Sequence, residues 1–287
     1  MTGQCSGIGA TPLQNAAILI PMNKTATRKI SRPRVRPLTV AVALVISLSM
    51  TPAVLSDPAL PGVVGADDRK AVTASGHPWN AVGQVNIGGY RARGQCTGTL
   101  VRPNLVITAA HCLMNEVTSK PHPLRHIHFL SGVRGGTHTA RAKAKCLRFL
   151  DGYDFVAEKA ARGVPLSALY LDVAAIVLDG ALPIEPAAIA VEQAPAPGEP
   201  LVHAAYPASR RYQLQAHMGC RLLNAPENVP VWLNDCDTEP SSSGGPVFVE
   251  ADKRLRLAAV MVGAGPRGNT AIPLATWQEL LDGKGCN

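Results

Sequence analysis

The sequence has few aromatic residues, little charge and little sustained helical periodicity. Phe, Trp and Tyr make up 4% of the 287 residues and charged residues 17%, whereas hydrophobic residues make up 46%. This balance excludes a disordered or collagen-like chain and leaves Val, Leu, Ile and Ala to form the core. The 24 prolines and 26 glycines favour many turns and argue against a helical bundle. A chain of this length forms one large domain or two small ones.

Acidic residues are absent from the first 56 positions. That segment carries six basic side chains: Lys24, Arg28, Lys29, Arg32, Arg34 and Arg36. Without it, 22 basic side chains face 20 acidic ones, so the net charge falls from +8 to +2. The excess positive charge therefore belongs to the N-terminus, and we expect no nucleic-acid partner.

The apolar run behind this basic cluster is too short to cross a bilayer. It covers residues 38–50 (LTVAVALVISLSM), between Pro37 and Pro52, whereas a spanning helix needs about 20 apolar residues. A basic segment, a short apolar run and small residues near Ser56 are typical of a secretory signal peptide. We predict that residues 1–56 form an N-terminal extension plus signal peptide, that translation starts at Met1 or Met22, and that the protein is secreted or periplasmic. No stable membrane insertion is expected after cleavage; an uncleaved signal anchor is the alternative.

The cysteines contain no CxxC pair, which argues against a zinc ribbon or a thioredoxin-like site. In an exported chain, six cysteines suggest three disulfides, with fifteen connectivities open. The histidines at 122, 126 and 128 lie close together, but no Cys or carboxylate accompanies them locally. We expect a solvated loop there, with no metal and no cofactor. The six cysteines after the signal peptide are Cys96, Cys112, Cys146, Cys220, Cys236 and Cys286.

Short apolar runs of strand length recur after residue 76 and predict an all-β protein. Residues 275–281 (ATWQELL) predict a C-terminal helix that ends at Gly283, and five prolines between residues 182 and 200 predict an extended connector. The expected organisation is a short propeptide or N-terminal arm (57–75), a first β domain (76–182), the connector (183–200) and a second β domain (201–287). The predicted strands are Ala81–Ile87, Thr99–Val101, Leu105–Thr108, Ile127–Leu130, Val173–Leu178, Pro246–Val249 and Leu255–Val262.

Three segments carry residues suited to nucleophilic catalysis. Residues 96–112 (CTGTLVRPNLVITAAHC) present His111 after an apolar strand, and Asp172 opens the apolar strand in LDVAAIVLD. Ser243 precedes Gly244-Gly245-Pro246 in CDTEPSSSGGPVF. Each is ordinary alone, but in this order they resemble the trypsin/chymotrypsin family of serine peptidases, over about residues 76–283.

The resemblance implies two perpendicular six-stranded β-barrels of the chymotrypsin-like type, with the active site between them. Ser243 would be the nucleophile, His111 its general base, and Asp172 the group that orients His111. Such an enzyme acts on a protein or peptide substrate, needs no cofactor and is by default a monomer.

The serine motif departs from the family pattern at two positions. The oxyanion hole would be formed by the backbone N–H groups of Ser241 and Ser243, but the family has Gly at the first position, where a Cβ is disfavoured. Ser242 replaces the Asp that pairs with a freshly cut N-terminus in trypsin-like members. A cut near Arg69-Lys70, in an exposed charged stretch, and the absence of a propeptide remain open. The competing function is a catalytically impaired pseudo-peptidase that acts as a binding protein.

The specificity residues and the disulfides follow from the same resemblance. Asp237-Thr238 look closer to the glutamyl endopeptidase-like branch, but Met261 or Val262 stands where that branch has its pocket His. Asp237 also has the position of the acid that gives trypsin its Lys/Arg preference, whereas Met261 favours an apolar or small pocket. The expected substrate-binding residues are Asp237, Thr238, Met261 and Gly263. The resemblance pairs Cys96 with Cys112; a Cys220–Cys236 bond would close the loop ahead of the serine motif, which leaves Cys146 and Cys286 as a third pair or two free thiols.

Overall fold

The computed structural model describes residues 61–89, 94–160, 169–190, 195–265 and 267–283. The predicted signal peptide lies outside these residues. Within them, no helix has the length and apolar character needed to cross a membrane.

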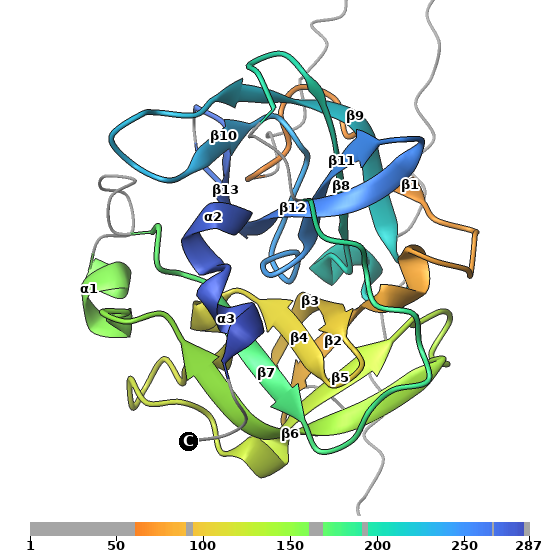
Figure 1. Ribbon diagram of the computed structural model, residues 1–287, viewed down its shortest axis with the longest axis vertical. Coiled ribbons are helices and arrows are strands. Elements are labelled where there is room, and N and C mark those ends of the chain that lie inside the picture. Colours follow the sequence, from red (N-terminus) through yellow and green to blue (C-terminus); the bar gives the residue numbers. More distant parts are fainter. Residues whose placement is uncertain (1–60, 90–93, 161–168, 191–194, 266, 284–287) are drawn as a thin grey trace, which may run out of the picture. The chain divides into compact units, whose positions relative to one another are not determined.

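The first barrel is a closed antiparallel sheet of six strands (Figure 1). Its strands follow one another around the barrel in the order β2-β3-β4-β7-β6-β5. Their bounds are β2 Val82–Ile87, β3 Gly94–Arg102, β4 Leu105–Thr108, β5 Ile127–Ser131, β6 Ala140–Phe149 and β7 Ala174–Leu178.

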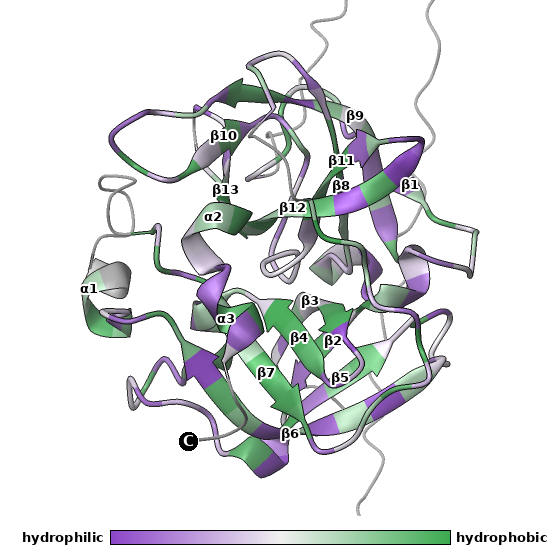
Figure 2. Cartoon of the chain, viewed as in Figure 1, coloured by the Kyte–Doolittle hydropathy of each residue, from purple (hydrophilic) through white to green (hydrophobic). Residues whose placement is uncertain are grey.

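Side-chain alternation explains why these segments form strands. Along the first half of β6, small buried alanines alternate with exposed basic residues, so one face packs on the core and the other meets water. Strands β4 and β7 are buried along their whole length, and Figure 2 shows both as continuous apolar segments. Because β4 and β7 pair with each other, the ends of two buried strands meet at one edge of the barrel.

The second barrel also contains six antiparallel strands. Their order is β9-β10-β13-β12-β11-β8, and pairing of β8 with β9 closes the ring. Two closed six-stranded barrels confirm the predicted chymotrypsin-like fold. The bounds are β8 Pro200–Ala205, β9 Gln215–Asn224, β10 Trp232–Asn234, β11 Pro246–Ala251, β12 Arg254–Gly263 and β13 Asn269–Pro273.

A segment ahead of the first barrel attaches to the second one. We call residues 61–72 the arm. Its strand β1 (Lys70–Ala71) pairs with β9, in the register Lys70 to Ala216 and Ala71 to Gln215. The chain therefore contacts the second barrel before it enters the first.

The helices are short. The predicted C-terminal helix over residues 275–281 forms as two pieces, α2 (Leu274–Trp277) and α3 (Glu279–Asp282). Trp277 is fully buried between them and the barrel, and its indole N–H donates to Ile272 O at 3.1 Å. The other helical segments are α1 (Phe155–Ala160) and the 3-10 turns η1 (Trp79–Ala81), η2 (Ala110–Leu113), η3 (Leu124–His126) and η5 (Ala208–Arg210).

The proline-rich segment runs from one barrel to the other in its described part. Leu182 N–H donates to Pro103 O in the first barrel, and Ala190 N–H donates to Leu257 O in the second. Backbone hydrogen bonds thus fix both ends of residues 182–190 although the segment forms no long strand.

Candidate active site

His111 and Asp172 lie side by side because their strands are paired. Thr108, the last residue of β4, is opposite Ala174, the first of β7, so η2 with His111 faces the residues just before β7. His111 Nδ1 lies 2.6 Å from Asp172 Oδ2, and His111 N–H donates to Asp172 Oδ1 at 2.8 Å. The Asp172 side chain is 1% exposed and that of His111 20%. The Asp172 carboxylate therefore contacts both the backbone N–H and the ring Nδ1 of His111.

Ser243 belongs to the second barrel, on a loop that contacts the first. We call residues 237–245 the serine loop. The N–H of Thr97 on β3 donates to Ser243 O at 2.9 Å, and the Thr97 hydroxyl donates to Ser241 O at 3.0 Å. Cys112 Sγ lies 3.7 Å from His111 Nε2 and 3.8 Å from Ser243 O. The structure therefore brings the serine loop together with the His111–Asp172 pair.

The glycine after Ser243 permits this close approach. Gly244 has φ +81°, and a Cβ built on it would lie 2.2 Å from both Thr108 Oγ1 and Thr97 O. Side chains do not fit at that distance, and non-glycine residues rarely adopt that φ. The packing of the loop against β3 and β4 thus requires glycine at position 244.

Ser241 adopts the backbone conformation that a glycine normally supplies. Its φ is +76°, in the left-handed region that costs an ordinary L-residue about 1–2 kcal/mol. Among the described residues, nothing accepts a hydrogen bond from the N–H of Ser241 or Ser243. Both N–H groups are therefore free of internal partners, as donors to a developing oxyanion must be.

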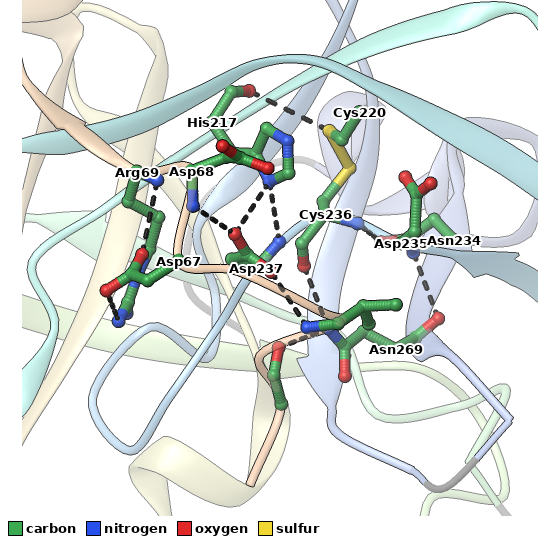
Figure 3. Close-up of polar contacts among 12 residues, drawn as sticks. Asp67, Asp68, Arg69, His217, Cys220, Asn234, Asp235, Cys236, Asp237 and Asn269 are labelled. Atoms are coloured by element: carbon green, nitrogen blue, oxygen red, sulfur yellow. Dashed lines mark hydrogen bonds and ion pairs between the residues drawn. A yellow bond between two sulfur atoms is a disulfide. The ribbon is translucent and has the colours of Figure 1, made fainter. Parts of the chain in front are cut away.

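The proposed specificity acid is enclosed by the protein itself. Asp237 is fully buried, and its two oxygens accept the N–H groups of Val64 and Asp68 in the arm at 2.9 and 2.8 Å. His217 Nδ1 accepts the backbone N–H of Asp237 at 3.0 Å and lies 3.2 Å from Asp237 Oδ2. Figure 3 shows Asp237 between the arm and His217. Each oxygen of this buried carboxylate already accepts a backbone N–H, so Asp237 is not an open cation-binding group.

Of the other expected specificity residues, Thr238 belongs to the serine loop and Met261 is hydrogen-bonded to it. Thr238 is buried, and its N–H donates to Gly62 O of the arm at 2.9 Å. Met261 on β12 is 1% exposed, and its backbone exchanges hydrogen bonds with Gly244 and Gly245. Gly263 ends β12 and is partly exposed. The Met261 side chain packs in the hydrophobic core, and its backbone is hydrogen-bonded to the serine loop.

In the charged stretch Asp67–Lys70, three residues are exposed as expected, but Arg69 is buried. The Arg69 side chain is 5% exposed and forms two hydrogen bonds to Asp67 and one to Glu239 of the serine loop. Burial opposes the charge on Arg69, but these carboxylates raise its pKa above the usual value. The hydrogen bond from Arg69 lowers the pKa of Asp67, and hydrogen bonds from Ser209 and Arg69 outweigh burial to lower the pKa of Glu239. Sequence reasoning missed this ion pair because its partners are 170 residues apart.

Two predicted disulfides are confirmed. Cys96 bonds Cys112, which links β3 to the turn that carries His111, and Cys220 bonds Cys236, which links β9 to the start of the serine loop. Cys146 is also disulfide-bonded, and its expected partner Cys286 lies outside the described residues.

Three groups of potential metal ligands occur in the described part of the chain, and each is already engaged. Two contain the disulfide sulfurs of Cys96–Cys112 and Cys220–Cys236, which are not thiolate ligands. The third is Asp68, His217 and Asp237, whose buried members hydrogen-bond each other and the arm. The histidines at 122, 126 and 128 do not converge into such a group within the described residues.

Comparisons with known proteins agree with this geometry. Residues 96–256 match the family model for the trypsin-like peptidase domain. A Glu endopeptidase solved in complex with MPD is 20% identical, with a TM-score of 0.61 over 77% of this chain and 97% of the other. The VesB protease of Vibrio cholerae is 14% identical, with a TM-score of 0.58 over 75% of this chain and 66% of the other. No protein with a curated description matches the sequence. At these identities the two structures show a shared fold.

Proposed function

The chain belongs to the family of trypsin-like peptidases, and from that premise we propose that it is an exported serine endopeptidase with a His111–Asp172–Ser243 triad. The hydrogen bonds from His111 to Asp172, beside the serine loop, carry the proposal. Membership of the family makes the substrate a protein or peptide and the reaction a hydrolysis. The serine mechanism and export are our inference.

Each member of the triad has a defined role in the proposed mechanism. Ser243 Oγ attacks the scissile carbonyl while His111 Nε2 takes its proton, and His111 then gives that proton to the leaving amine. Water, deprotonated by the same imidazole, releases the acyl group from Ser243. Asp172 keeps the Nδ1–H tautomer of His111 and stabilises the imidazolium that forms in both steps.

The Ser241 backbone favours an enzyme over a pseudo-peptidase. A serine at this position could leave its N–H pointing away from the oxyanion. The φ of Ser241, however, lies in the left-handed region, the conformation that glycine supplies in the family. The N–H groups of Ser241 and Ser243 are free of partners among the described residues. We infer that both N–H groups donate to the oxyanion. Loss of one such donor costs about 100- to 1000-fold in rate.

The enclosure of Asp237 argues against a trypsin-like preference. Both oxygens of that carboxylate already accept backbone N–H groups, so a substrate Lys or Arg would have to displace the arm to reach it. We infer that the side chain before the scissile bond is not basic. Peptide-library profiling tests this point, and a dominant preference for Lys or Arg contradicts it.

Labelling with a fluorophosphonate probe tests the triad. We expect stoichiometric modification of Ser243, located by mass spectrometry, in the purified exported protein. Ser243→Ala abolishes labelling because the nucleophile is absent, and His111→Ala abolishes it because the base is absent. His138→Ala, remote from the triad in sequence and from its hydrogen bonds, serves as the control and retains the label. A folded wild-type protein that takes no label contradicts the proposal and favours the pseudo-peptidase.

N-terminal sequencing of the exported protein tests the signal peptide. We expect a new N-terminus near Asp57, because the small residues of the predicted cleavage site precede it. An intact N-terminus in a membrane fraction identifies the uncleaved anchor instead.

A further inference from the structure

Residues outside the triad hold the serine loop in shape, and their charges are almost fully buried. Glu239, four positions before Ser243, has a side chain that is 8% exposed. Its Oε2 accepts Arg69 Nη2 at 3.0 Å and its Oε1 accepts the N–H of Ser209 at 2.6 Å. A buried carboxylate of this kind is stable only while it is paired. Glu239 is therefore fixed by the arm on one side and by η5 on the other.

The backbone of Glu239 closes the turn that contains Ser241. Ser242 N–H donates to Glu239 O at 3.0 Å, and Glu239 N–H reaches Ser242 Oγ at 3.4 Å. Ser241 lies inside this turn with its left-handed φ, and Ser243 follows directly. Because a positive φ persists only where the surroundings enforce it, whatever anchors Glu239 helps hold Ser241.

Arg69 is itself held rigidly before it reaches Glu239. Asp67 accepts its Nε and Nη2 at 2.8 and 2.9 Å, a two-point contact that fixes the plane of the guanidinium. The next two residues form β1 on β9, and Asp68 N–H is bound to Asp237. The cation therefore has a fixed place at the base of the serine loop, although it comes from a segment that precedes both barrels.

We propose that Arg69 is a positioning residue, whose buried ion pair with Glu239 holds the Ser241–Ser243 turn in its oxyanion-binding shape. The inference rests on the proposed function. Ser242 offers no carboxylate to a freshly cut N-terminus, and the Arg69–Glu239 pair supplies an internal ion pair to the same turn. The pair is present in the uncut chain, so its formation requires no cleavage between Arg69 and Lys70.

The test compares two arginines that tie the same arm. Arg69→Met removes the contact with the serine loop. Arg134→Met is the matched control, because the Arg134 guanidinium donates to Val72 O and Ala74 O and, among the described residues, forms no hydrogen bond or ion pair with that loop. We expect the second-order rate of fluorophosphonate labelling to fall about tenfold or more in Arg69→Met and to stay within about twofold in Arg134→Met. Equal losses in both variants, or no loss in Arg69→Met, overturn the proposal.

The double variant Arg69→Met/Glu239→Gln separates positioning from stability. It leaves no unpaired charge at position 239, so its free energy of unfolding recovers relative to Arg69→Met. Labelling remains slow because the tether is still missing. Recovery of labelling together with stability overturns the proposal.

Hydrogen exchange provides a readout that does not depend on catalysis. The N–H groups of Ser242, Gly244 and Gly245 are hydrogen-bonded within or beside the turn. We expect them to exchange about tenfold faster or more in Arg69→Met and at the wild-type rate in Arg134→Met. If the wild type takes no label but this exchange difference appears, the proposed function fails and the anchoring role of Arg69 stands. Unchanged exchange in Arg69→Met overturns the anchoring role whatever the labelling shows.

Discussion

Ser241 has a backbone conformation that serine disfavours but that the turn before Ser243 requires. Its φ of +76° is unfavourable for a serine, yet Thr97 holds its carbonyl and the turn from Glu239 to Ser242 encloses it. Conformational strain of this size at a catalytic loop is normally compensated by the packing around it. The strain therefore indicates how firmly the neighbours of Ser241 hold the loop.

Substitution of Ser241 tests whether its N–H is already in place. In Ser241→Gly we expect the free energy of unfolding to rise by about 0.5 kcal/mol, since relief of the left-handed strain exceeds the chain entropy of glycine. The labelling rate should stay within about twofold. Ser241→Val should lose about 2 kcal/mol, because a β-branched residue strongly disfavours that φ. Urea titration and labelling measure both effects; a large acceleration of labelling in Ser241→Gly contradicts a preformed oxyanion hole.

At the scale of elements, the contact of the serine loop with β3 and β4 depends on Gly244. In Gly244→Ala we expect a loss of about 3 kcal/mol or more, because the new Cβ meets Thr108 Oγ1 and a backbone oxygen at 2.2 Å. Gly219 has the same φ of +81°, but a Cβ added there would meet no atom within 4 Å, so Gly219→Ala measures the cost of φ alone, about 1 kcal/mol. Equal losses from the two substitutions, measured by urea unfolding, contradict the packing argument.

Strands were predictable from the sequence where their residues form a continuous apolar run. Leu105–Thr108 matches β4 residue for residue, whereas β9 was missed because exposed Met218, Gly219 and Arg221 interrupt its apolar residues. Very short strands such as β10 form only because partners on both sides complete their hydrogen bonds. A local pattern carries no information about those partners.

Local sequence patterns also predict only part of the candidate site, because they carry no information about distant partners. His111, Asp172 and Ser243 lie in distinctive local motifs, so their sequence context suffices to select them. The hydrogen bonds from Val64 and Asp68 to Asp237 join residues more than 160 positions apart. Neither partner has a local signature, and only the folded chain shows that the arm covers this carboxylate.

At the scale of the whole molecule, a buried histidine links stability to pH. Burial is the main cause that lowers the pKa of His203 to about 4, against a smaller opposing effect of its hydrogen bond to Pro246 O. The unfolded state, with a pKa near 6.5, binds a proton that the folded state excludes. Stability from this group is therefore complete above about pH 6.5 and falls as pH drops towards 4.

We expect the free energy of unfolding to decrease by about 3 kcal/mol over that interval on account of His203. His203→Asn keeps a donor for Pro246 O but does not titrate, so it should flatten the slope between pH 6.5 and 4. The lowered carboxyl pKa values of Asp67 and Glu239 act in a lower window, because their stabilisation is lost only below about pH 4. Urea titrations at several pH values separate the two windows; an unchanged slope in His203→Asn contradicts the assignment.

The proposed triad is divided between the barrels, since His111 and Asp172 belong to the first and Ser243 to the second. A ligand that contacts both barrels binds only when the two barrels are packed together, so its binding stabilises that arrangement. At a ligand concentration one hundred times its dissociation constant, the stabilisation is about 2.7 kcal/mol. Peptide in the surroundings thus protects the molecule that degrades it. When substrate is scarce, this stabilisation is lost, and we expect each molecule to have a shorter lifetime. The abundance of the peptidase should then follow the concentration of its substrate.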